Sequence, residues 1–270
     1  MLGFKLRSLI GILLLLFAIQ THAQIVILTA ETPSAVEFAN DVAKKLNGQQ
    51  IAINPSKYGD SDTVITVGNT PLQNVANKKQ IALATYVSFD SFAKLQIDNR
   101  PQHVIYSDPS PGALREAIEK HFPNRSIGYI RSGGEDQYLD LLEKAGVKLT
   151  TYPLSANDIY KTLSAIYRAD QPDLMLVSEN RDIYNQNTIL FVLESLYRNR
   201  IPVIATNRAL INKGSTLTVF TTKETIAERT AAVVLAIVSG AGAQSEIFPE
   251  AEVQVDRNLA DKLNIAVRGK

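Results

Sequence analysis

Short apolar runs rich in β-branched residues alternate with amphipathic stretches over nearly all of this chain. Residues 25–28 and 174–177 are unbroken apolar runs, which are typical of strands covered on both faces. Thr32 and Pro33 favour the start of a helix, whose apolar residues follow i, i+3 and i+4 spacing until Gly48 ends it. Strands that alternate with helices in this way predict parallel sheets with helices on both faces.

The alternation continues long enough to fill two units. We expect strands at residues 25–28, 51–53, 64–67, 81–84, 104–106, 127–130, 149–152, 174–177, 203–205, 217–220 and 252–255. We expect helices at residues 32–46, 71–76, 90–95, 112–122, 136–145, 158–168, 188–198, 224–239 and 258–263. The predicted fold class is therefore α/β with two Rossmann-like lobes, in which 25–28 and 174–177 are central, fully buried strands.

The first 23 residues have the three-part pattern of a cleavable secretory signal. Lys5 and Arg7 precede an apolar run that is shorter than the roughly 20 residues of a membrane span. Thr21 and Ala23 then place small residues at a cleavage site before Gln24. The alternative is an uncleaved anchor, which the length of the run disfavours. We expect residues 1–23 to be a signal peptide and the mature protein to reside in the periplasm.

Composition narrows the function classes. The chain has no Cys, which excludes disulfides, thiolate metal sites, a Cys nucleophile and a lipid-modified Cys. Without Lys5 and Arg7, the 28 Lys and Arg residues become 26, against 27 Asp and Glu. This balance gives no electrostatic reason to expect a nucleic acid or an anionic membrane surface as partner. No later apolar run approaches the roughly 20 residues of a bilayer span.

Motifs for catalysis are absent from the sequence. His103 and His121 are interpreted as surface or capping residues, and no serine stands in a G-x-S-x-G setting. There is no zincin, Walker A or EF-hand spacing. Gly133 and Gly134 lie between a strand and a helix, where they form either an anion cradle or only a tight turn. We therefore expect no enzyme, no metal and no cofactor.

Polar residues directly after the predicted strands are the candidate ligand site. In open α/β sheets, ligands bind in the crevice at the carboxyl ends of the strands. The same residue types also serve as helix caps and turn formers, so each has a structural alternative. The candidates are Thr29, Glu31, Asn69, Tyr86, Ser107, Asp108, Ser132, Ser178, Glu179 and Asn207. Asp108 is the expected partner of a ligand ammonium group.

The chain has no Trp, so an aromatic cage around a ligand would have to come from tyrosines. The tyrosines considered for an aromatic cage are Tyr58, Tyr86, Tyr106 and Tyr184.

The second half of the chain resembles the family of ABC-transporter substrate-binding proteins that includes tryptophan-binding members. The segments that carry the resemblance are 126–130, 172–177, 200–205, 213–217 and 255–265, within residues 103 to 268. Ser107-Asp108-Pro109 stands where that family commonly has Thr-Asp-Pro at the crossover into the second lobe.

The resemblance implies a type I periplasmic-binding-protein-like fold, in which three crossovers join the lobes and a ligand closes between them. By that pattern lobe 1 comprises residues 24–108 plus 214–245, and lobe 2 comprises 109–213 plus 246–270. Relative to the family, the first lobe is shortened, because Asp108-Pro109 runs almost directly into the next helix.

Three functional hypotheses follow. The first is a periplasmic protein that captures a small polar or aromatic, amino-acid-like solute and delivers it to the membrane permease of an ABC importer. The second is an exported accessory or sensor subunit of the same fold, which presents its lobes to a membrane receptor and binds no solute. The third is a secreted α/β enzyme, which is disfavoured because no nucleophile in the sequence is paired with a base. Ligand identity and oligomeric state are not encoded in any motif.

Overall fold

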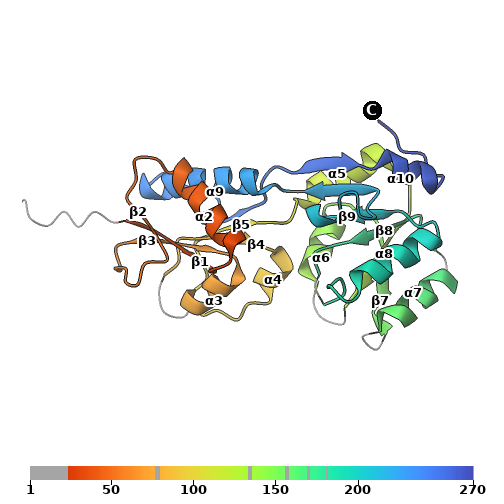
Figure 1. The fold of residues 1–270 in the computed structure, drawn as a ribbon, viewed down its shortest axis with the longest axis horizontal. Helices are drawn as coiled ribbons and strands as arrows, with labels where there is room; N and C mark the ends of the chain where they lie inside the picture. Colours follow the sequence, from red (N-terminus) through yellow and green to blue (C-terminus); the bar gives the residue numbers. More distant parts are fainter. Residues whose placement is uncertain are drawn as a thin grey trace, which may run out of the picture.

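The computed structural model describes residues 24–76, 80–132, 136–155, 158–168, 171–180 and 182–269. The expected signal peptide and the Gly133-Gly134 turn lie outside these residues. Figure 1 shows two lobes side by side along the longest axis of the molecule, each built around one sheet of six strands.

The first lobe contains a wholly parallel sheet in the order β11-β5-β4-β3-β1-β2. Its strands are β1 (Ile25–Thr29), β2 (Ile51–Ile53), β3 (Thr63–Val67), β4 (Leu83–Val87), β5 (His103–Tyr106) and β11 (Glu246–Ile247). Its helices are α2 (Pro33–Lys45), α3 (Asn69–Ala76), α4 (Phe89–Ala93) and α9 (Lys223–Val238). Helices α2 and α9 pack together over one face of this sheet (Figure 1).

The second lobe has the order β12-β10-β9-β8-β6-β7, with only β12 antiparallel to its neighbour. Its strands are β6 (Ile127–Arg131), β7 (Leu149–Pro153), β8 (Leu174–Val177), β9 (Val203–Ala205), β10 (Leu217–Phe220) and β12 (Glu252–Val255). Its helices are α5 (Pro111–His121), α6 (Gln137–Lys144), α7 (Ile159–Arg168), α8 (Ile189–Arg198), the 3₁₀ turn η2 (Arg208–Leu210) and α10 (Arg257–Lys262).

Local sequence signals set the starts of several helices. The Ser110 hydroxyl accepts the Ala113 N–H at 3.1 Å, and Pro111 occupies the first turn of α5. Asp136 and Asp256 cap α6 and α10 in the same way, through the N–H groups three residues later. These caps satisfy N–H groups that have no partner within the helix. Thr32 precedes α2 as expected, although its side chain makes no capping hydrogen bond.

The two apolar runs singled out in the sequence are interior strands, as predicted. Strand β1 lies between β2 and β3, and β8 lies between β6 and β9. All four residues of β8 are buried, and in β1 only Leu28 is partly exposed. Burial of each such aliphatic side chain contributes about 1.5–3 kcal/mol, so these strands anchor the two sheets.

The strand membership corrects the expected lobe boundaries at two places. Residues 217–220, assigned above to the first lobe, form β10 and pair with β9 in the second sheet. Residues 246–247, assigned to the second lobe, form β11 and pair with β5 in the first sheet. A strand of two residues is too short to leave a periodic pattern, so β11 was missed. The second and third crossings between the lobes therefore follow Phe220 and Ile247.

One further strand is displaced from its expected position. Strand β4 covers Leu83–Val87 rather than 81–84, although Ile81 is completely buried, as its apolar character suggests.

None of the helices among the described residues is both long and apolar enough to cross a membrane.

Candidate functional site

A cavity of about 870 Å³ lies between the two lobes, at the carboxyl ends of strands from both sheets. We call it the interlobe cleft. The first lobe contributes Gly68, Asn69, Thr70, Tyr86, Ser88, Ser91 and Ser107, and the second contributes Val177, Ser178, Glu179, Tyr184, Asn185, Gln186, Ile189, Asn207, Ala209 and Leu210. A cavity at this edge, with polar groups converging on it, has the usual character of a small-molecule site.

Six of the ten candidate residues line this cleft. They are Asn69, Tyr86, Ser107, Ser178, Glu179 and Asn207. Two of them also perform the structural role that the sequence left open. The Asn207 side chain accepts the Ala209 N–H at 2.8 Å, and the Ser178 hydroxyl accepts the Asn180 N–H at 3.4 Å. Direct ligand contact by any of the six stays a prediction.

Asp108 occupies a different position from the one expected. Its side chain is 4% exposed, and its Oδ2 accepts the Phe89 N–H at 2.6 Å, at the start of α4. It is not among the residues that line the cleft. Burial, followed by the negative charge of Glu179, raises the pKa of Asp108 to about 8. Asp108 is thus a buried acid behind the cleft wall, and a direct pairing with a ligand ammonium group does not fit this geometry.

Three other candidates also lie away from the cleft lining. Thr29 donates its backbone N–H to Asn54 Oδ1 at 2.8 Å, and Glu31 is exposed to solvent. The Ser132 hydroxyl accepts a hydrogen bond of 3.4 Å from Asn180. Thr29 ends β1, and Glu31 and Ser132 come just after the ends of β1 and β6. A place at a strand end does not determine which way the side chain points.

Tyr86 is held in the cleft by an unusual backbone conformation. Its φ is +58°, in the left-handed region, and the β4–β5 register shifts between Thr85 and Val87. The Tyr86 ring lies 5.0 Å from the Phe38 ring, between centroids. A non-glycine residue in this region costs about 1–3 kcal/mol, and such strain is concentrated at functional sites. Burial, and then the charge of Glu179 on the opposite lobe, raises the pKa of Tyr86.

Two residues of the cleft lining carry buried polar atoms without a hydrogen-bond partner among the described residues. These atoms are Asn69 Oδ1 and the Tyr184 hydroxyl oxygen. A buried polar group left unpaired costs about 1–3 kcal/mol, so native structures rarely keep one without a reason. A bound polar solute could supply the missing partners.

Four of the eleven lining residues that were not among the ten candidates come from the segment after β8. Tyr184, Asn185, Gln186 and Ile189 lie between β8 and the first turn of α8. Within this segment, the Asn185 side chain accepts the Asn187 N–H at 3.0 Å. An Asn-rich stretch after a buried strand was the available signal. Of the tyrosines considered for an aromatic cage, Tyr86 and Tyr184 line the cleft, whereas Tyr106 is a core residue.

Direct contacts join the lobes beside the cleft. Asp90 Oδ1 in α4 accepts the Tyr138 N–H of α6 at 2.9 Å, and Lys94 Nζ lies 2.9 Å from Asp182 Oδ2. The Phe89 and Tyr138 rings are 6.3 Å apart, between centroids. Burial, and then the negative charge of Asp136, raises the pKa of Asp90 to about 6. The relative placement of the lobes thus depends on both apolar and ionisable groups.

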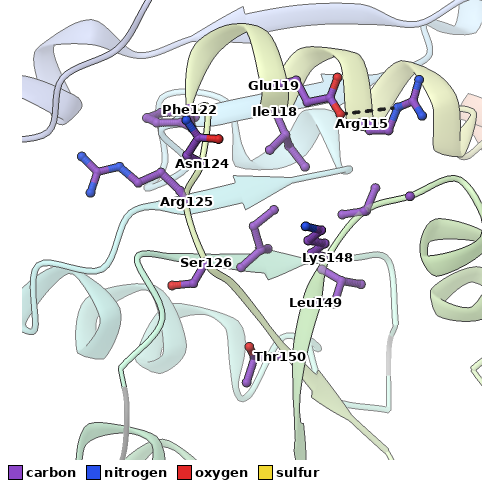
Figure 2. Close-up of a pocket in the computed structure, with 13 residues that line it drawn as sticks. Arg115, Ile118, Glu119, Phe122, Asn124, Arg125, Ser126, Lys148, Leu149 and Thr150 are labelled. Carbon is purple, nitrogen blue, oxygen red and sulfur yellow. Dashed lines mark ion pairs between the residues drawn. The ribbon is translucent and has the colours of Figure 1, made fainter.

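A second cavity, of about 510 Å³, lies wholly within the second lobe (Figure 2). It is bounded by the end of α5 and the starts of β6 and β7, the sheet edge opposite to the cleft. Two of its cations have partners: Arg115 Nε is 3.7 Å from Glu119, and Arg125 Nη1 is 3.1 Å from Asp173. Because these charges are already paired and one lobe alone forms the walls, the interlobe cleft is the stronger candidate.

The two histidines among the described residues have structural partners. Nδ1 of His103 lies 2.8 Å from the Gln244 carbonyl oxygen, and Nδ1 of His121 lies 2.8 Å from the Arg268 carbonyl oxygen. Neither residue lines the interlobe cleft. His121 stands in the last turn of α5, as expected.

Two α/β lobes, each with a largely parallel sheet, and three crossing segments define the type I periplasmic-binding-protein fold. No protein-family model and no curated protein matches the sequence. Solved structures do match, and they are similar to this chain in fold.

One is a ligand-free, open substrate-binding protein with adhesive properties from Clostridium difficile, at TM-score 0.64 and 16% identity, covering 90% of this chain and 95% of the other. A conserved domain protein from Vibrio cholerae matches at TM-score 0.59 and 17% identity, covering 91% and 95%. An ABC domain in complex with L-Trp from Streptococcus pneumonia matches at TM-score 0.56 and 18% identity, covering 90% and 95%. The fold expected from the sequence is confirmed.

Proposed function

We propose that this protein is an extracytoplasmic solute-binding protein, which captures a small polar solute between its lobes and delivers it to an ABC importer. The observation that carries the proposal is the interlobe cleft, because both sheets contribute polar residues to one cavity of about 870 Å³. A site divided between two lobes can close around a ligand by hinge rotation. The three crossings, after Tyr106, Phe220 and Ile247, are the segments about which such a rotation would occur.

The state of the lining residues supports the same proposal. The strained Tyr86 backbone and the unpartnered oxygen of Asn69 both lie in the cleft lining. Similar folds occur in a substrate-binding protein and in a domain that holds L-Trp. By this proposal the first 23 residues direct export, the protein works in the periplasm, and its macromolecular partner is the membrane permease. No catalytic step is part of the proposal.

A thermal-shift screen against amino acids, sugars and purines tests the proposal. A solute present at 100 times its Kd should stabilise the folded protein by about 2.7 kcal/mol. For a protein of this size, that corresponds to a rise in Tm of about 5–10 °C.

A matched pair of variants locates the binding. Thr70→Trp fills the exposed rim of the interlobe cleft, and Thr150→Trp makes the same change in the second cavity. We expect the first variant to lose the Tm rise and the second to keep it. If neither variant alters the rise, the solute binds elsewhere. If no compound raises Tm, the role of an accessory or sensor subunit for a membrane receptor replaces solute binding.

A further inference from the structure

The charge in the interlobe cleft has one sign among the described residues that line it. Glu179, at the end of β8, is the charged member of that lining, and the other polar members are Asn, Gln, Ser, Thr and Tyr. Glu179 is half-buried, so its carboxylate is less screened than a surface group. Burial is the largest cause that raises the pKa of Tyr86, and the charge of Glu179 is the second.

Further acidic groups stand behind the wall of the cleft. Asp90 lies in α4, and Glu224, in the first turn of α9, also acts on Tyr86. Asp108 adds little charge at neutral pH, because its pKa of about 8 keeps it largely protonated. Arg208 is the cation that acts on Tyr86, and its guanidinium lies over the Phe220 ring, 5.7 Å from the centroid. Low-dielectric walls with one predominant charge focus the electric field into the space between them.

We propose that the interlobe cleft selects solutes with a protonated amine, and that Glu179 is the counter-ion of that amine. This inference rests on the proposed function and names its substrate class. Carboxylate groups bind ammonium groups through short, charge-assisted hydrogen bonds. The body of the solute would lie against Tyr86, Tyr184 and Ile189, while Asn69 and Asn185 offer polar contacts. An anionic solute would instead meet the carboxylate of Glu179 within a confined space.

Two series of probes test the inference, and within each series the body is shared while the charge of the terminal group changes. Tryptamine, tryptophol and indole-3-acetate share an indole body and are cationic, neutral and anionic at neutral pH. Putrescine, 1,4-butanediol and succinate form an aliphatic series of the same kind. The protein has no Trp, so indole fluorescence excited beyond the absorption of tyrosine reports the first series without background from the protein. Calorimetry reports the second series.

The expected result is that the cation of at least one series binds about tenfold or more tightly than its neutral counterpart, and that the anion binds weakest. Glu179→Gln should reduce binding of that cation by about tenfold or more and leave the neutral probe within about twofold. Glu119→Gln, a matched change at the second cavity, should leave both affinities unchanged. Circular dichroism confirms that each variant is folded.

Equal binding of the cation and its neutral counterpart in both series would overturn the inference. So would equal losses for cationic and neutral probes in Glu179→Gln, and so would the absence of binding by both cations. If the broad thermal-shift panel still yields a neutral or anionic solute that Thr70→Trp excludes, the proposed function stands without its amine selectivity. If that panel yields no solute, the proposed function itself fails.

Discussion

Asp108→Asn is expected to flatten the pH dependence of stability between about pH 4 and pH 8. The parent protein should lose stability as pH rises through this window, on the order of 5 kcal/mol as an upper bound for this one group. At pH 8 the variant should therefore be more stable than the parent, and near pH 4 the two should be alike. Urea unfolding followed by circular dichroism at several pH values measures the difference.

The sign follows from proton binding. Burial, and then the charge of Glu179, raises the pKa of Asp108 to about 8 in the folded protein, well above that of an unfolded aspartate. Between these two values the folded state holds the proton more tightly, so raising the pH favours unfolding. The side-chain amide introduced by Asp108→Asn would keep an oxygen that can accept the Phe89 N–H, which Asp108 accepts at 2.6 Å. Asp90, whose pKa is raised to about 6, adds a contribution of the same sign.

Asp173→Asn provides a control of opposite sign. Partial burial opposes ionisation of Asp173, but hydrogen bonds from the Ser126 N–H and hydroxyl and the charge of Arg125 lower its pKa overall. Above about pH 4, Asp173→Asn should therefore be less stable than the parent, because the ionised Asp173 carboxylate stabilises the folded parent there. A parent profile that is flat or rises from pH 5 to pH 8, unchanged in Asp108→Asn, would contradict the buried position of Asp108.

Gly128→Val is expected to destabilise the second lobe by about 3 kcal/mol or more. Gly128 lies in β6, between β7 and β8. A Cβ atom placed there would lie 2.7 Å from Pro172 Cγ and 3.0 Å from Tyr152 Cε2. A proline ring has little freedom to move aside, so the backbone of β6 or of the segment before β8 must shift. Chemical unfolding at fixed pH gives the change in the free energy of unfolding.

Two further variants make the Gly128 result specific. Gly112→Ala, in the first turn of α5, places a Cβ atom where nothing lies within 4 Å. It should change stability by less than about 1 kcal/mol, in the stabilising direction. Combining Gly128→Ala with Pro172→Ala should recover part of the loss caused by Gly128→Ala alone, because the two side chains collide directly. A tolerated Gly128→Val would mean that β6 does not pack against Pro172.

The fold could be predicted from the sequence because its strands carry continuous apolar runs. Strands such as β8 are buried on both faces, so nearly all of their residues are apolar. Capping residues such as Ser110 and Asp136 mark the starts of helices. The boundaries between the lobes could not be predicted as well. Strand β10 and the two-residue β11 belong to sheets that depend on pairing between distant segments, which local patterns do not encode.

The site was only partly predictable, for a different physical reason. A polar residue after a strand reaches the correct edge of the sheet, which placed Ser178, Glu179 and Asn207 in the cleft lining. Whether its side chain faces the cleft depends on the turn that follows. Asp108 turns inward to the Phe89 N–H, and Tyr86 enters the cleft through a left-handed backbone that its residue type does not favour.

Closure of the two lobes around a solute is measured most directly as a distance between them. The chain has no Cys, so spin labels can be attached to a Gln73→Cys, Leu190→Cys double variant alone. Both positions are exposed and lie next to the cleft lining, in α3 of one lobe and α8 of the other. A second pair, Glu37→Cys with Gln73→Cys, lies within the first lobe. Pulsed electron paramagnetic resonance, with and without the panel compound that raises Tm most, should show the interlobe distance shorten while the intralobe distance stays constant. An interlobe distance that does not change at saturation would contradict the account.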